Sequence, residues 1–358
     1  MTLRAMTSGP HTHSMFTVSR TMIAVMVCLA PATLFGLAQF GLPSLLLFLT
    51  TLAAALGFEV LCLALAGQPI RRFAGDGSAV LTGWLVALSL PPWAPWWIGV
   101  TGAGLAIVLG KHMFGGLGQN LFNPAMVARA ILLVAVPVQM TVWSLPLGLS
   151  GGVGAGPDLS QAVAITFGGV IPPDALSGAS LLGQLQSQLD AGQDISALSA
   201  PQALRQQLFG VTPGSLGETS AFLLLLGGMA LVLLRIINIV VPLSVLGGLG
   251  LCAGVAHLIA PMAYPSPVLH LTTGSVMLCA FFIATDYVTA PVTGLGKAIY
   301  GLGIGVLIFV IRSWGAFPEG VAFAVLLMNA CAPLIDRFAR PRVFGRTRRG
   351  QPLALEDR

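Results

Sequence analysis

Long apolar runs follow one another along most of the chain, separated by short polar segments or by breaks rich in glycine and proline. A helix that crosses the hydrocarbon core of a bilayer needs about 20 apolar residues, and most of the runs approach that length. The third run is too short for a straight span, unless it extends into the tryptophan-rich segment 91–97. The pattern predicts ten spans, near residues 22–39, 43–66, 78–91, 97–113, 123–141, 220–237, 240–260, 271–287, 298–313 and 318–335.

The composition narrows the class of protein. Of the 358 residues, 56% are hydrophobic and only 8% are charged, whereas roughly a quarter of the residues of a soluble domain are charged. A water-soluble globule is excluded, and we expect an all-α polytopic membrane protein. The net charge of +5 does not indicate nucleic-acid binding, because seven of the 17 basic residues are arginines of the segment 337–358, which we interpret as a membrane-surface anchor. The five cysteines stand singly, without histidines at ligand spacing, so we expect no metal site.

Basic residues indicate the side of the membrane that each segment faces. With the N-terminus inside, ten crossings place the C-terminal arginines and most internal basic residues on that same face, as the positive-inside rule requires. One long acidic loop separates the ten spans into two groups of five. Because five is an odd number, the second group would cross the membrane in the opposite orientation to the first, so we expect two inverted five-helix repeats. The predicted parts are a first membrane repeat (1–141), an outer loop (142–219), a second membrane repeat (220–336) and a basic inner tail (337–358).

The outer loop contains a short motif. The segment 174–180 resembles the pattern that flavin transferases recognise when they join FMN, through its phosphate, to a hydroxyl group, which here is that of Ser180. Such a site needs a nucleophilic side chain, small neighbours and an exposed strand or loop. Capping of the helix predicted to follow would also account for Ser177 or Ser180. The fixed positions of the motif are Asp174, Ser177, Gly178, Ala179 and Ser180.

Two further segments place polar residues at the ends of predicted helices. Asn120 and Asn123 follow a glycine-rich stretch and precede the fifth span, where the free N–H groups of a helix start attract polar groups. These asparagines could bind a polar ring edge such as that of an isoalloxazine, or could cap the helix. Thr285 and Asp286 end the eighth span, where an acid is either exposed at the surface or turned inward for a function.

Ionisable residues within the apolar runs are candidates for an ion path. Glu59 lies inside the second run, and an acid at that depth costs on the order of 3 kcal/mol unless it is paired or hydrated. It could serve as a cation or proton site, or could form a structural pair with Arg129 of the fifth span. His257 and His270 could relay protons. For Arg312, we expect a side chain that reaches the outer surface by snorkelling.

Four segments together resemble the RnfD family, which supplies the D subunit of the Rnf ion-translocating oxidoreductases. The resemblance extends from about residue 20 to about residue 340, and more distantly to the B subunit of the sodium-pumping NADH:quinone oxidoreductase, whose membrane fold is similar to that of urea and ammonium channels. It implies a ten-helix inverted-repeat protein in the bacterial inner membrane, with cytoplasmic termini and a periplasmic loop 142–219. The segments are 75–78, 122–125, 177–180 and 281–286.

The resemblance also implies cofactors and partners. FMN would be joined covalently to Ser180, where the family usually has threonine, and riboflavin would bind within the membrane part, for which Asn120, Asn123, Thr285 and Asp286 are the candidates. Electrons would pass between the two flavins and drive Na⁺ or H⁺ movement, with Glu59 and Asp286 as ion-path candidates.

The chain has no NAD fingerprint and no iron–sulfur cysteine set. It would therefore need the other membrane and peripheral subunits of a ferredoxin:NAD⁺ oxidoreductase, including an outer FMN-carrying subunit and iron–sulfur subunits, and a flavin transferase for maturation. The alternative is a solute channel or secondary transporter of the related fold, which predicts no coloured cofactor and no use for the motif.

Overall fold

Helices account for nearly all of the regular structure in the computed structural model, which describes residues 17–147, 156–169, 177–178, 180–190, 206–261, 263–315, 317, 319–340 and 345. The N-terminal half contains α1 (Val18–Phe40), α2 (Leu42–Leu65), α3 (Ile70–Phe73), η1 (Ala74–Asp76), α4 (Ser78–Ser89), α5 (Trp96–Gly104), η2 (Leu105–Lys111), η3 (His112–Phe114), α6 (Pro124–Ala135) and α7 (Pro137–Thr141). The segment after it contains β1 (Trp143–Ser144), α8 (Leu159–Gly168), β2 (Ser177–Gly178), α9 (Leu181–Asp190) and η6 (Leu216–Glu218). The C-terminal half contains α11 (Ala221–Leu233), α12 (Val240–Ile259), α13 (Pro267–Thr272), α14 (Val276–Leu278), η7 (Cys279–Ile283), α15 (Gly294–Trp314) and α16 (Val321–Phe338).

Six of these helical segments are long and apolar enough to cross a membrane. They are α1, α2, the continuous stretch 96–114, α12, α15 and α16, and four shorter apolar helices accompany them, namely α4, α6, α8 and α11. The prediction of a helical, multi-pass membrane protein is confirmed. In the part of the chain that the structure describes, β1 and β2 pair in antiparallel orientation over two residues each and form a small sheet.

Two predicted spans are interrupted. The fifth was expected to run through residues 123–141, but α6 ends at Ala135 and Pro137 begins α7, since a proline has no N–H group to continue the helix. The eighth was expected over residues 271–287, but α13 ends at Thr272 and helical structure resumes only at Val276. Between them Gly274 has a φ of +70°, a conformation that other residues rarely adopt. The third span is short as predicted.

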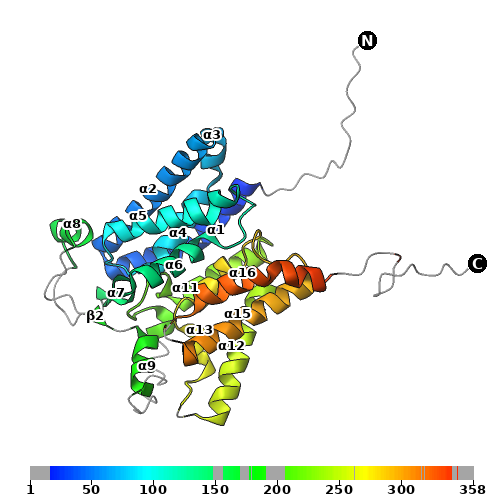
Figure 1. Ribbon diagram of the computed structural model, residues 1–358. Helices are drawn as coiled ribbons and strands as arrows, with labels where there is room; N and C mark the ends of the chain where they lie inside the picture. Colours follow the sequence, from blue (N-terminus) through cyan, green and yellow to red (C-terminus); the bar gives the residue numbers. More distant parts are fainter. Residues whose placement is uncertain are drawn as a thin grey trace, which may run out of the picture.

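The two halves lie side by side (Figure 1). Helices α1 to α6 gather on one side of the molecule and α12, α15 and α16 on the other, while α1 packs against α11 and α6 against α16 where the halves meet. The start of α1 and the end of α16 lie at one end of the bundle, here called the termini end. Helices α7 and α8 and strand β2 lie at the opposite end, here called the loop end.

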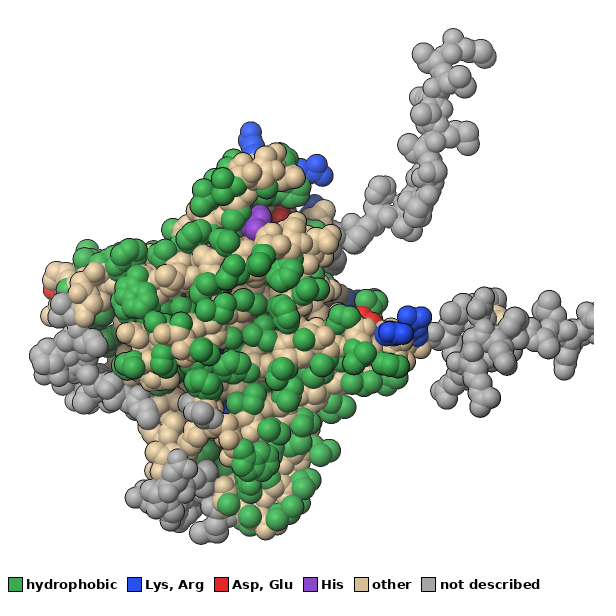
Figure 2. All heavy atoms as spheres, in the orientation of Figure 1, with side chains coloured by type: hydrophobic (Ala, Val, Ile, Leu, Met, Phe, Trp, Pro, Cys, Tyr) green, Lys and Arg blue, Asp and Glu red, His purple; other side chains and the backbone are tan. Residues whose placement is uncertain are grey.

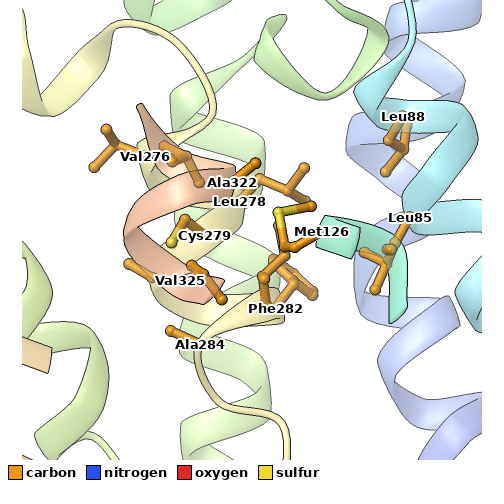
Figure 3. Close-up of a cluster of buried hydrophobic side chains, with 14 of the residues drawn as sticks. Leu85, Leu88, Met126, Val276, Leu278, Cys279, Phe282, Ala284, Ala322 and Val325 are labelled. Carbon is orange, nitrogen blue, oxygen red and sulfur yellow. The ribbon is translucent and has the colours of Figure 1, made fainter. Parts of the chain in front are cut away.

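Short and interrupted helices meet in the centre of the protein. Figure 3 shows Leu85 of α4, Met126 of α6 and Phe282 of η7 directed towards one another, with Val325 of α16 beside them. Figure 2 shows that hydrophobic side chains cover most of the face in view, whereas lysine and arginine gather at its margins. The outer face thus suits a lipid environment.

Candidate functional site

Ser180 is the N-cap residue of α9. Its Oγ accepts a hydrogen bond from the N–H of Gly183 at 3.2 Å, so the alternative of helix capping is confirmed for this serine. Ser180 is also buried, so the expectation that the motif hydroxyl is exposed is wrong, because the hydroxyl turns back onto the first turn of α9. Ser177 and Gly178 form β2, which pairs with β1, so part of the motif is a short strand; Asp174 and Ala179 lie outside the described residues.

A small cavity, here called the Ser180 cavity, lies against this serine. Gln207, Glu218, Thr272 and Thr273 are among the residues that line it. The hydroxyl groups of Thr272 and Thr273 donate to Oε1 of Gln207 at 2.9 and 3.1 Å. Within the described residues, the buried Nε2 of Gln207 has no partner, so an unused hydrogen-bond donor is present at this cavity.

Glu218 belongs to a buried acid pair. Arg129 contacts Glu218 at 3.5 Å and forms a shorter ion pair with Glu319, while its other terminal nitrogen donates to the carbonyl oxygen of Ser89 at 2.9 Å. Burial and the adjacent Glu319 raise the pKa of Glu218 to about 8. Burial alone would raise the pKa of Glu319, but Arg129 and hydrogen bonds from Ser275 lower it. The pair therefore carries one negative charge at neutral pH, with the proton on Glu218.

Glu59 forms a second buried cluster near the termini end. Its carboxylate contacts Nζ of Lys111 at 2.7 Å and Nε2 of His112 at 3.0 Å. Lys111 also donates to Oγ of Ser78 at 2.8 Å, and Ser78 in turn donates to Asp76. The expected pairing of Glu59 with Arg129 is therefore wrong. Arg129 contacts Glu218 and Glu319 instead, so the two residues belong to separate clusters.

A cavity of roughly 130 Å³, here called the Asn120 cavity, opens between α1, α4, α6, α11 and η7. It brings together the four residues proposed from the sequence to hold a membrane-embedded ligand, although they come from opposite halves of the chain. Both segments of π-helix, η2 and η7, contribute to its wall, and such irregular turns are frequent at functional sites. Its polar lining includes Ser78, Thr82, Lys111, Asn120, Asn123, Thr285 and Asp286.

Local hydrogen bonds hold these polar residues in place. Oδ1 of Asn123 accepts from the N–H groups of Ala125 and Met126 at 3.1 and 3.3 Å, so this asparagine caps α6. Asn120 donates to the carbonyl oxygen of Phe122 at 3.1 Å. Asp286 accepts from the N–H of Val288 at 3.2 Å within its own turn. Asn123 thus caps the helix and also lines the cavity.

A third cavity, of roughly 210 Å³ and here called the His270 cavity, lies near the loop end. His270 is only 3% exposed and Arg312 only 8%. Arg312 donates to the carbonyl oxygens of His270 at 2.7 Å and Thr273 at 2.9 Å, so the expectation that it snorkels to the surface is wrong. Among the described residues, no hydrogen-bond partner contacts either ring nitrogen of His270, and none contacts Nε of Arg312. His257, the other proposed relay residue, contacts the carbonyl oxygen of Tyr264 at 2.8 Å.

Three of the buried ionisable residues were not predicted from the sequence to be buried. In the sequence, Lys111 and Glu218 are only charges that mark a membrane face, and Glu319 belongs to no motif. A charge next to the end of an apolar run is the signal that these residues share. That signal does not reveal that the end of the run is buried within the protein.

Comparison with known proteins identifies the family of the chain. A family model described as the NQR2, RnfD, RnfE family matches residues 5–345. A protein of Rhodobacter capsulatus, named as the D subunit of an ion-translocating oxidoreductase complex, is 57% identical over 85% of this chain and 84% of its own length. Proteins of the same name from Stutzerimonas stutzeri and Halorhodospira halophila are 51% and 47% identical, over 94% and 98% of both chains respectively. The chain therefore belongs to the NQR2, RnfD, RnfE family.

Proposed function

We propose that this protein is the D subunit of an ion-translocating oxidoreductase complex, in which it carries electrons between a covalent FMN on Ser180 and a second, non-covalent flavin in the Asn120 cavity. Its relatives bear the name of that subunit. The observation that carries the proposal is the position of Ser180: the hydroxyl group of the flavin-transferase motif lines a cavity with an unused donor.

The surroundings of Ser180 fit a phosphate ester. The first turn of α9, a ten-residue helix, offers free N–H groups and a partial positive charge to an anion. The unpartnered Nε2 of Gln207 supplies a further donor. Glu218 lines the same cavity, but its raised pKa keeps it uncharged at neutral pH, so that it does not repel a phosphate.

The Asn120 cavity fits a flat, partly polar ring. Leu85, Phe281 and Phe282 supply apolar walls, and Asn120 lies among the polar residues of the lining. Lys111 adds a positive charge to the wall. A bound flavin supplies one- and two-electron chemistry that no side chain of this protein offers. The role of the protein is to position the ring, exclude water and set the local charge.

The Glu59 cluster supports a role in ion movement. Lys111 contacts Glu59 and also lines the Asn120 cavity, so a change in charge inside the cavity alters how strongly Lys111 holds the carboxylate. We expect Glu59 to exchange this pairing for a proton or Na⁺ during turnover. Asp286, in the cavity wall, is the second candidate on this path.

The packing of the helices supports the finer membrane topology. If the protein consists of two inverted five-helix repeats, then α2 corresponds to α12 and the stretch 96–114 to α15, so the contact of α2 with α5 should recur as a contact of α12 with α15. Both contacts are present. We propose ten membrane segments in the bacterial inner membrane, six of full length and four short or interrupted, with periplasmic residues 142–219 and cytoplasmic termini. The relation to the fold of urea and ammonium channels, which the family resemblance implies, is part of the same proposal.

Fluorescence of the denatured protein tests the proposal. Wild-type protein from its native host, or produced together with a flavin transferase, should fluoresce under ultraviolet light in a denaturing gel. Ser180→Ala should lose the signal, whereas Ser180→Thr, which restores the usual residue of the family, should keep it. A wild-type band without fluorescence would favour the channel alternative. An undiminished signal in Ser180→Ala would remove Ser180 as the attachment site.

A further inference from the structure

Two buried polar side chains in the His270 cavity leave part of their hydrogen-bonding capacity unused. Neither ring nitrogen of His270 has a partner among the described residues, and the same holds for Nε of Arg312. Unpaired buried polar groups are costly and rare in native proteins. The cavity beside them therefore suits a ligand that presents hydrogen-bonding atoms along one edge.

Apart from Gln186 and Ser313, the remaining walls of this cavity are aromatic and apolar. Tyr264 and Trp314 line it together with Leu182, and the ring of Phe309 supports the arrangement from behind, 5.7 Å from the ring of His270 and 5.8 Å from that of Trp314. Aromatic walls facing a polar edge are typical of sites for flat heteroaromatic rings.

The His270 cavity is adjacent to Ser180. Leu182 of α9 lines both cavities, and Ser180 is the N-cap of this same helix. A Cβ atom added to Gly274, which lines the Ser180 cavity, would lie 3.1 Å from Cδ1 of Leu182 and 2.7 Å from Nη2 of Arg312. The two cavities therefore meet at Leu182, Gly274 and Arg312, and a group attached to Ser180 is tethered beside the larger one.

We propose that the isoalloxazine ring of the flavin attached to Ser180 lies in the His270 cavity, with its pyrimidine edge towards His270 and Arg312. This inference rests on the proposed attachment at Ser180 and adds the residues that hold the ring. The fixed charge of Arg312 beside that edge favours the reduced ring, because reduction adds negative charge there. His270 and Arg312 are thus positioning residues, and the charge of Arg312 also raises the reduction potential.

A pair of backgrounds tests the placement without a measurement of activity. His270→Leu is made in the wild type, which carries the flavin, and in Ser180→Ala, which does not, and the thermal unfolding midpoint of each protein is measured. In the wild type the substitution should lower the midpoint, because the ring loses a partner. In Ser180→Ala it should leave the midpoint unchanged or raise it, because an unpaired buried imidazole is removed. Equal shifts in the two backgrounds would overturn the placement.

Fluorescence of the folded protein gives a second test at a residue whose replacement does not threaten folding. Trp314 is 66% exposed, and contact with an aromatic side chain quenches flavin fluorescence. Trp314→Leu should raise the native fluorescence of the covalent flavin towards the level of the unfolded protein and shift its midpoint potential. The control Trp96→Leu replaces another loop-end tryptophan that does not line the cavity and should change neither quantity.

The mass of the Ser180 peptide is measured in every variant, which separates the two claims. If the adduct is present but Trp314→Leu behaves like Trp96→Leu, the ring lies elsewhere and the placement is wrong, while the attachment stands. If the wild type carries no adduct, the attachment and the placement are both wrong.

Discussion

At the level of single residues, several buried charged side chains pair with an opposite charge that is distant in the sequence. Glu59 pairs with Lys111, and Arg129 with Glu319. Removing one member of such a pair leaves the other charged group buried and typically costs roughly 3–5 kcal/mol. These clusters therefore stabilise the packing of helices, and those beside cavities can also respond to a charged ligand.

The Glu59 cluster gives a prediction about ion coupling. Glu59→Gln should leave flavin content normal but slow ion-coupled turnover in membrane vesicles, because the carboxylate that would bind the ion is absent. The double variant Glu59→Gln/Lys111→Met removes the unpaired lysine and should regain thermal stability but not coupling. Ion transport at the wild-type rate in the double variant would exclude Glu59 from the ion path.

The acid pair gives a prediction about pH. The pKa of Glu218 is about 8 in the folded protein and 4.5 in its ordinary state. Between these values the folded state holds a proton that the unfolded state has lost, so stability should fall as the pH rises from about 4.5 to about 8. Glu218→Gln cannot ionise, and its thermal unfolding midpoint should depend less on pH in this window.

A carboxylate with a shift of opposite sign provides the control. Hydrogen bonds from the N–H of Gln161 and from Ser160 lower the pKa of Asp158, which caps α8. Its contribution is therefore complete above pH 3.8 and is lost only as the pH falls below that value. Asp158→Asn should keep the wild-type slope between pH 4.5 and 8. A Glu218→Gln protein with that same slope would contradict the protonation assigned to the pair.

At the scale of secondary-structure elements, interrupted helices position the site. α13 and α14 are separated by three residues, and the second of these, Gly274, adopts a left-handed conformation. At the last residue of this break, the N–H of Ser275 donates to Glu319 at 2.6 Å. The interruption thus brings the start of one helix to the acid pair and the end of the other to the His270 cavity.

The break at Gly274 gives a prediction about stability. Gly274→Ala should destabilise the protein by about 1–3 kcal/mol, the usual cost of a strained backbone position, and its added methyl group would also press on Arg312. The matched control is Gly247→Ala, in the interior of α12 with nothing within 4 Å of the added Cβ, which should stabilise by about 0.5–1 kcal/mol. Thermal unfolding measures both; equal effects would contradict the strain assigned to Gly274.

Much of the helix order could be predicted from the sequence, because an apolar run fixes where a helix crosses the membrane. The lateral neighbours of each residue could not, since hydropathy reports depth and not which helices touch. For this reason the partner predicted for Glu59 is wrong, and the burial of Arg312 is unexpected. The approach of Asn120 and Asn123 to Thr285 and Asp286 was expected only through the family resemblance, because the separate halves of the chain give no sign of their contact.

At the scale of the whole molecule, the three cavities lie towards opposite ends of the bundle. The Ser180 and His270 cavities adjoin α9 near the loop end, and the Asn120 cavity lies near the start of α1 at the termini end. The packed core shown in Figure 3 includes Leu85 and Phe282, which also line the Asn120 cavity. The proposed electron path would therefore connect cofactor sites at opposite ends of the bundle.

Covalent attachment of FMN to Ser180 is decided by the mass of the proteolytic peptide that contains this residue, taken from protein purified from its native host. We expect a peptide heavier by one FMN phosphoester, with the modification on Ser180, and the same adduct in Ser180→Thr but not in Ser180→Ala. An unmodified Ser180 peptide in fully assembled native protein would show that this chain carries no covalent flavin there.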